Sequence, residues 1–228
     1  CIEVDYALRN VTDYIIASPI STPAIGANYT TLVRDGLFKE DVSQIAASYY
    51  NYIVSLPISN VYSDFGMVVS CVKTSELENL AAVTRNYISR MPAYNITSEN
   101  DTVYNWSSMD GVTQYELYAR KYFYRPHFYD FSCAMYKMLP EEQYAEWRKA
   151  LDKCLVYYNA TEKFYVEEDN LGNSKYLNVD LLHFCAISAF VPQLIYRRNA
   201  GACIFGDLNE CFALTEWYED AGWKAAGW

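Results

Sequence analysis

The sequence has few groups suited to acid–base catalysis or to holding a metal ion. Only two of its 228 residues are histidine, His127 and His183. The spacings HxxxH, HxxE and CxxC do not occur, so a structural zinc site is not expected. The glycines at positions 26, 36 and 66 stand alone, which argues against a phosphate-binding loop. We therefore predict neither a metal site nor a cofactor.

Positive charge and long apolar runs are also scarce. The chain has 18 lysines and arginines against 28 acidic residues, a formal net charge of -10. Such a chain repels phosphate backbones, so a nucleic-acid partner is not expected. A membrane-spanning helix needs ~20 apolar residues, and the longest such stretch, Cys185 to Val191, is short and contains Ser188. We expect a water-soluble chain without a membrane span.

The seven cysteines show no regular spacing. An odd number leaves at least one thiol unpaired, and most of the cysteines lie in apolar strings, where cysteine behaves as a small core residue. Since 52% of the residues are hydrophobic, the chain can bury a sizeable core. The sequence starts with neither an initiator methionine nor a signal peptide, so we expect that an upstream segment has been removed.

Helix and strand patterns alternate in the first part of the chain. Apolar residues with a 3.6-residue period predict helices, and short β-rich runs predict strands. Ser75 with Glu78 predicts a capping box at the start of one helix. The alternation predicts an α/β fold in which helices cover a parallel or mixed sheet. The predicted elements are a helix near the N-terminus with Val4, Leu8 and Val11 facing inward, strands at 13–17 and 65–72, and helices at 42–56 and 77–88.

The composition changes after Pro92, where a polar stretch is followed by one rich in tyrosine. We predict a domain boundary there, with a core over residues 1–92 and an insertion plus C-terminal subdomain over 93–228 packing on it. The later predictions are a helix from Pro140 to Cys154, a strand at 155–158, a polar loop at 159–178, a buried apolar segment at 181–192 and a short helix near 214–221.

Tyrosine is abundant, with 23 residues. A dense cluster of tyrosines can line a peptide or carbohydrate groove, although packing of helices against a sheet explains it equally simply, and we favour packing. A Cys/His nucleophilic pair within this chain is conceivable, but we favour hydrogen-bonded, structural histidines. The clustered tyrosines are Tyr118, Tyr122, Tyr124 and Tyr129.

The segment Ile2–Pro19, IEVDYALRNVTDYIIASP, resembles the segment that follows the nucleophile in clostripain-family cysteine peptidases. Other family elements have counterparts along nearly the whole chain. These are FYDF at 128–131, WRKALDKCLVYY at 147–158, HFCAISAFVP at 183–192 and WYEDAGWKAAGW at 217–228.

The resemblance implies a caspase-like three-layer α/β/α sandwich with a mostly parallel sheet, plus a C-terminal extension of helices and strands. It also implies endopeptidase chemistry, in which a cysteine thiolate attacks the peptide carbonyl and a histidine relays the proton. That histidine normally lies upstream, in an N-terminal portion that many members release by self-cleavage and keep bound.

The register of the resemblance bears on the nucleophile. In the family the nucleophile precedes the Glu-Val pair by about six residues, whereas Cys1 precedes Glu3 by two. This predicts a nucleophile just upstream of residue 1. The alternative is that a compressed loop makes Cys1 the nucleophile, because a thiol at a helix N-terminus gains thiolate character.

The loop after the first strand corresponds to the family's specificity pocket, so Ser18 and Ile25 are the predicted substrate-binding residues. Ile25 stands where the family commonly has an acidic residue. An apolar side chain leaves a buried guanidinium without its partner, which argues against the family's preference for Arg or Lys before the cut.

The sequence therefore predicts the larger, C-terminal portion of a clostripain-like cysteine endopeptidase. Its expected partners are a peptide or protein substrate and the N-terminal portion of the same precursor. The resemblance also implies a secreted, periplasmic or cell-surface location, and it allows calcium as a cofactor, although no motif here supports calcium. The alternative function is a non-catalytic module of the same fold that binds peptide or glycan.

Overall fold

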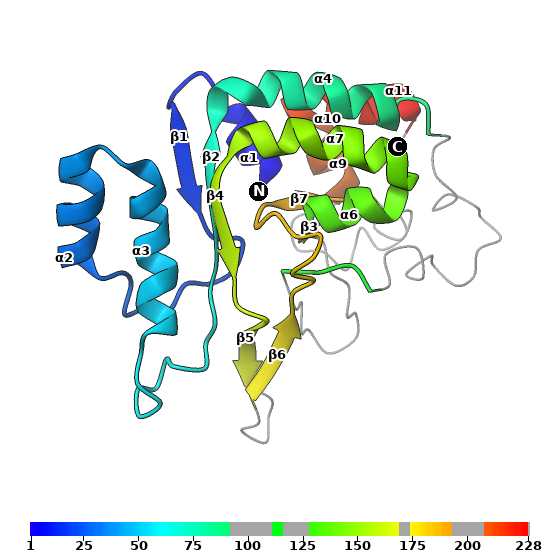
Figure 1. Cartoon of the computed structure of the whole chain (residues 1–228). Coiled ribbons are helices and arrows are strands. Elements are labelled where there is room, and N and C mark those ends of the chain that lie inside the picture. Colours follow the sequence, from blue (N-terminus) through cyan, green and yellow to red (C-terminus); the bar gives the residue numbers. More distant parts are fainter. Residues whose placement is uncertain (92–110, 116–127, 169–173, 193–207, 228) are drawn as a thin grey trace.

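The computed structural model describes residues 1–91, 111–115, 128–168, 174–192 and 208–227. Its central feature is a three-stranded sheet with helices on both faces (Figure 1). The sheet consists of β1 (Tyr14–Ala17), β2 (Val68–Lys73) and β4 (Leu155–Ala160), in the order β1-β2-β4. The predicted α/β class, with helices over both faces of a sheet, is confirmed.

All the paired strands run antiparallel within the described part of the chain, so the prediction of a mostly parallel sheet is wrong there. Ile16 of β1 pairs with Cys71 of β2, which pairs with Tyr157 of β4. The connections explain the direction. Between β1 and β2 the chain makes two opposed helical passes, first through α2 (Tyr29–Thr31), η1 (Leu32–Gly36) and η2 (Leu37–Lys39) and then through α3 (Val42–Val54) (Figure 1). An even number of passes returns the chain to the end where β1 stopped, so β2 runs the opposite way.

The helix α3 covers one face of the sheet. Asp41 caps it, because the carboxylate accepts hydrogen bonds from the backbone N–H groups of Ser43 and Gln44 at 3.0 and 3.2 Å. Its buried Ile53 packs with Met67 and Val69 from β2 and the turn before it. The predicted helix at 42–56 is confirmed to within two residues of its C-terminal end.

The other face carries α4 (Leu77–Ile88) and α7 (Glu141–Cys154), which lie side by side. Inside this layer the indole N–H of Trp147 donates to the Thr84 hydroxyl at 2.9 Å. The predicted capping box is wrong, because η3 (Thr74–Glu76) precedes α4 and no side chain caps it. The helices predicted at 77–88 and from Pro140 to Cys154 are confirmed.

Two smaller sheets lie beyond the central one. The strands β3 (Phe128–Asp130) and β7 (Ser188–Phe190) pair, and β5 (Lys163–Glu168) pairs with β6 (Ser174–Asn178). The prediction of a polar loop over 159–178 is therefore wrong. The apolar face of this hairpin is short: Phe164, Val166 and Leu177 pack against a hydrophobic cluster. Cross-strand contacts between other side chains add to it, since the Lys163 ammonium lies 4.4 Å from the Tyr176 ring centroid.

The remaining helices are α1 (Ile2–Ala7), α6 (Phe131–Met138), α9 (Leu208–Ala213), α10 (Glu216–Asp220) and α11 (Trp223–Ala226). Residues from both sides of position 92 share the main core, among them Ile2, Leu80, Trp147 and Trp217. The domain boundary at residue 92 stays a prediction. No helix in the described ranges is long and apolar enough to cross a membrane.

Candidate active site

The predicted catalytic end of the chain is the first turn of α1. The Cys1 side chain is half-buried, and its carbonyl accepts the backbone N–H groups of Val4 and Asp5 at 3.0 and 2.9 Å. The helix turns a different face inward from the one predicted: Val4, Leu8 and Val11 are exposed. Tertiary contacts override the apolar pattern, because the inward face packs on α10 and β7.

Tyr6 anchors this inward face. Its ring lies 5.3 Å from the Trp217 ring in an edge-to-face contact, and its hydroxyl donates to Asp220 at 2.8 Å. Arg9, just after the helix, binds Glu216 at 2.7 Å and Glu78 at 3.3 Å. The helix that follows Cys1 is thus held by residues from the C-terminal end of the chain.

Two acidic side chains are buried in the same turn, and the sequence analysis did not identify them. Glu3 is 8% exposed and Asp5 is 4% exposed. Burial raises the pKa of both carboxyl groups, that of Glu3 to about 7. The Glu3 Oε1 atom accepts the backbone N–H of Phe190 in β7 at 2.8 Å. The signal in the sequence was their spacing: Asp5 lies three residues from Ile2 and Glu3 three residues from Tyr6, so the two acids flank the face that Ile2 and Tyr6 share.

The predicted specificity loop leaves the end of β1. The Ser18 hydroxyl hydrogen-bonds to the carbonyl and N–H of Ile20, so it stabilises the turn at the strand end. Ile25 is partly buried and packs against the cluster of Ile53, Met67 and Val69 under α3. Gly26 follows with φ +72, which a side chain would strain. The pocket roles of Ser18 and Ile25 stay predictions.

His183 is a structural histidine, as the sequence analysis favoured. Its Nδ1 lies 2.7 Å from the Asp180 carboxylate, and its ring stacks on Tyr136 with 3.7 Å between centroids. No hydrogen bond joins it to a cysteine within the ranges that the structure describes. His127 lies outside those ranges. The structure therefore brings no Cys/His pair together in the part of the chain that it covers.

A second buried carboxylate, Asp130, organises the β3–β7 region. It accepts four donors: the hydroxyl of Tyr115 at 2.6 Å and the backbone N–H groups of Cys133, Cys185 and Ala186 at 3.0 Å each. Burial still raises its pKa, although these donors counteract the rise. The network holds Ala186 in a left-handed conformation, φ 59. Asp130 belongs to the FYDF element, whose structural role the sequence alone did not show.

Most cysteines lie in the core, as predicted. Cys71, Cys133, Cys154 and Cys185 are buried, free thiols, whereas Cys211 is exposed. Burial raises the pKa of the Cys71 thiol to about 11. These buried thiols are poor nucleophiles, so Cys1 is the partly accessible cysteine at the predicted catalytic end.

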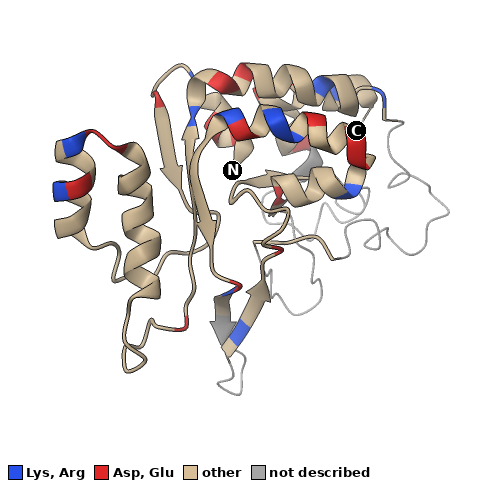
Figure 2. Cartoon of the chain, viewed as in Figure 1, with Lys and Arg blue, Asp and Glu red and all other residues tan. Residues whose placement is uncertain are grey.

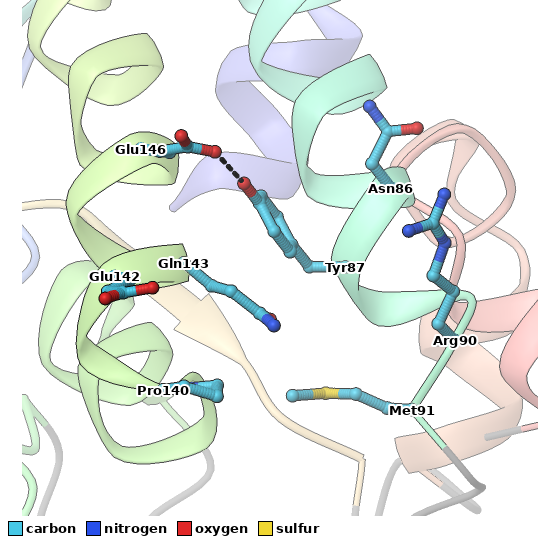
Figure 3. A pocket seen from close by; sticks show the side chains of 8 residues that line it. All are labelled: Asn86, Tyr87, Arg90, Met91, Pro140, Glu142, Gln143 and Glu146. Carbon is cyan, nitrogen blue, oxygen red and sulfur yellow. Dashed lines mark hydrogen bonds between the residues drawn. The ribbon is translucent and has the colours of Figure 1, made fainter.

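A pocket of about 420 Å³ lies between the end of α4 and the start of α7. Figure 3 shows Tyr87 and Met91 facing Gln143 and Pro140 across it, with the Tyr87 hydroxyl donating to Glu146 at 3.2 Å. The described residues that line it include no cysteine or histidine, so they supply no Cys/His pair there. A tyrosine groove gains no support either: Tyr129 is 1% exposed, and Tyr118, Tyr122 and Tyr124 lie outside the described residues.

Charge is distributed rather than concentrated. Figure 2 shows lysines and arginines scattered over separate elements and interspersed with carboxylates. Several are ion-paired, such as Arg34 and Lys39 with Asp35 and Arg148 with Asp152. No group of three His, Cys, Asp or Glu side chains that could hold a metal ion occurs among the residues placed by the structure. Calcium dependence stays a prediction, because calcium also binds backbone carbonyl and amide oxygens.

The sequence matches the family model described as the clostripain family over residues 1–220. A solved structure described as a B. fragilis cysteine protease has a TM-score of 0.73 and 29% sequence identity, covering 100% of this chain and 84% of that chain. An inactive zymogen of a C11 protease from Parabacteroides distasonis has a TM-score of 0.73 and 27% identity, covering 97% of this chain and 55% of that chain.

A third similar structure is a secreted C11 cysteine protease from Bacteroides thetaiotaomicron in complex with an irreversible peptide inhibitor. Its TM-score is 0.70 at 23% identity, a likeness that shows the fold alone, and the match covers 97% of this chain and 56% of that one. The chain thus spans little more than half the length of the second and third structures. No curated protein matches the sequence.

Proposed function

This chain belongs to the clostripain family of cysteine proteases, and we propose that it is the larger, C-terminal portion of a cysteine endopeptidase. The observation that carries the proposal is the separation of the catalytic groups. The family match covers residues 1–220, yet the one histidine in the described ranges, His183, is held by Asp180 and Tyr136. A protease of this family needs a histidine beside its thiol, and His127 lies outside the described residues. Because the family's histidine normally lies upstream of the nucleophile, we assign it to an upstream portion.

The free edge of β1 supports an upstream partner. Among the described strands β1 pairs with β2 alone, so its other edge presents backbone N–H and C=O groups. A strand from the N-terminal portion can add to this edge through main-chain hydrogen bonds. Such an addition would complete the caspase-like sheet, and any parallel strands of that sheet would come from this portion.

The chemistry follows from a thiol and a histidine brought together at the start of α1. The histidine takes the thiol proton, and the thiolate sulfur bonds to the scissile carbonyl carbon. The C–N bond then breaks as the imidazolium returns the proton to the leaving amine. Water hydrolyses the resulting thioester and frees the thiol. We place the nucleophile just upstream of Cys1, with Cys1 itself as the second choice.

The substrate is a peptide or protein, held in part by the loop that contains Ser18 and Ile25. Because Ile25 offers no charge to a guanidinium, we propose an uncharged rather than a basic residue before the cut. The similar zymogen and secreted proteases support synthesis as an inactive precursor and export from the cytoplasm.

The test uses the intact precursor, incubated with a library of peptide substrates and with a peptidyl acyloxymethyl ketone. We expect cleavage, and labelling of one cysteine that mass spectrometry places at or just upstream of residue 1. A Cys1→Ser variant separates the two choices: labelling persists if the nucleophile is upstream and disappears if it is Cys1. Absence of both cleavage and labelling contradicts the proposal. Peptide binding that survives alkylation of every accessible thiol supports the non-catalytic alternative.

A further inference from the structure

Glu3 is a buried carboxyl group that lacks half of its hydrogen bonds. Its Oε1 atom accepts the backbone N–H of Phe190 at 2.8 Å. Its Oε2 atom is fully buried and has no hydrogen-bond partner in the part of the chain that the structure describes. A buried polar atom without a partner is costly and rare in folded proteins, so it points to a group that reaches this position from outside the described residues.

The protonation state of the Glu3 carboxyl group determines whether its missing partner is a hydrogen-bond donor or an acceptor. An ionised carboxylate that is stabilised only by the backbone N–H groups of Phe190 and of Glu3 itself is costly in a buried position, whereas the neutral acid buries no charge. Burial is the largest influence on this group and raises its pKa to about 7. In the neutral acid, Oε1 still accepts from Phe190 and Oε2 carries a proton to donate. The missing partner is therefore an acceptor.

The charged groups around Glu3 are few. On its own helix, Asp5 raises its pKa and the N-terminal ammonium group lowers it. The strand β7, Ser188–Phe190, brings no titratable side chain. The helix α10 brings Asp220 and Glu216, which bind Tyr6 and Arg9. No cation in the described residues pairs with the Glu3 carboxyl.

We propose that Glu3 is a positioning residue for the nucleophile: its neutral carboxyl group accepts from Phe190 and donates from Oε2 to a backbone carbonyl of the segment directly upstream of Cys1. The proposal rests on the proposed function, because that segment holds the nucleophile in our assignment. Glu3 then ties the nucleophile segment to β7. That strand pairs with β3, and the residues before it are held by Asp130, so the anchor is rigid.

The test compares Glu3→Gln and Glu3→Leu in the intact precursor. Glutamine keeps an acceptor for Phe190 and a donor at the Oε2 position, whereas leucine removes both. The readout is the second-order rate constant for labelling by the peptidyl acyloxymethyl ketone, measured from pH 6 upward. At pH 6 we expect Glu3→Gln to label within about twofold of the wild type and Glu3→Leu at least about tenfold more slowly.

The pH profile separates positioning from folding. In the intact precursor Cys1 has no ammonium group to lower the pKa of Glu3, and a hydrogen bond donated by Oε2 favours the neutral acid, so the pKa is raised further there. The rate of wild type relative to Glu3→Gln should therefore fall only as the pH rises through this raised pKa. Asp5→Asn, which neutralises the other buried acid of the turn, is the matched control: it should keep the fall in rate with pH but move it to lower pH, because Asp5 raises the pKa of Glu3. If Glu3→Leu does not fold, the glutamine variant and its pH profile still decide.

Two results overturn the inference. Glu3→Gln labelling as slowly as Glu3→Leu would mean that an ionised acceptor is required. Wild-type rates at every pH in both variants would mean that Glu3 does not position the nucleophile. Either result leaves the proposed function standing if the wild-type precursor is labelled, whereas a wild-type precursor that is never labelled contradicts the proposed function itself.

Discussion

Two buried carboxyl groups, Asp130 and Glu3, occupy opposite situations in one molecule. Asp130 is 0% exposed and accepts four donors from Tyr115, Cys133, Cys185 and Ala186. Glu3 is 8% exposed and accepts one inter-element donor, the N–H of Phe190. The two groups are similarly buried but differ in their hydrogen bonds. Asp130 has all the partners that a structural carboxylate needs, whereas Glu3 needs a further one.

The largest expected effect comes from removing Asp130, the acid that accepts four hydrogen bonds. Asp130→Ala leaves four buried donors without their acceptor and should lower the free energy of unfolding by about 4 kcal/mol. Glu3→Ala removes the acceptor of one donor and should cost about 1 kcal/mol. Urea denaturation of both variants at pH 6 measures the difference. Equal costs would contradict the contrast between the two sites.

Raising the pH should destabilise the protein through Glu3. The folded-state pKa is about 7 against an ordinary value of 4.5, so the folded state retains a proton that the unfolded state loses. The stabilisation is complete below pH 4.5 and is lost as the pH rises to about 7, a change of about 3 kcal/mol. Unfolding free energies of wild type and Glu3→Gln at pH 4.5 and pH 8 test this. A difference between the two proteins that does not change with pH would refute it.

Thiol reactivity provides a third comparison of the two regions. Cys1 beside Glu3 is half-buried, whereas Cys133 and Cys185 beside Asp130 are buried, with pKa values raised by burial. Iodoacetamide should modify Cys1 at least about a hundredfold faster than either, because the buried thiols react only after local opening. Peptide mapping over a time course gives the rates, with the exposed Cys211 as a positive control. Modification of Cys185 as fast as that of Cys211 would show that the Asp130 region opens readily.

The smallest effect concerns a single donor. Tyr115→Phe removes the 2.6 Å hydrogen bond to Asp130 and leaves three backbone donors, so the free energy of unfolding should fall by about 1.5 kcal/mol. The exposed Tyr29→Phe is a matched control that should be neutral. Thermal unfolding of the two variants checks the expectation. A loss as large as that of Asp130→Ala would mean that the network depends on Tyr115 rather than on the carboxylate.

Local patterns predicted the long elements well. The α/β class was predicted from patterns among neighbouring residues. These patterns are the apolar stripes of α3, α4 and α7 and the β-rich runs of β1, β2 and β4. Strand direction could not be predicted in this way, because it depends on how many helical passes connect two strands. The β5–β6 hairpin was missed because its apolar face is short, with Phe164 and Val166 on β5 and Leu177 on β6.

The candidate active site also has features that local sequence patterns could not predict. The resemblance of residues 2–19 predicted the catalytic end and the family, and the family match confirms the family. It did not locate Glu3, whose hydrogen bond spans 187 residues, or Asp130, whose backbone donors at Cys185 and Ala186 lie 55 and 56 residues away. An acidic residue within an amphipathic pattern looks solvent-exposed until a distant segment covers it.

The sequence by itself determined the long helices, the strands of the central sheet and the family. These depend on residue spacing, which is encoded locally. Only the tertiary structure decided which acids are buried, how many hydrogen bonds each accepts and which of the described strands lie at the edges of the central sheet. Those properties arise from the desolvation and hydrogen bonding that segments far apart in the chain impose on one another.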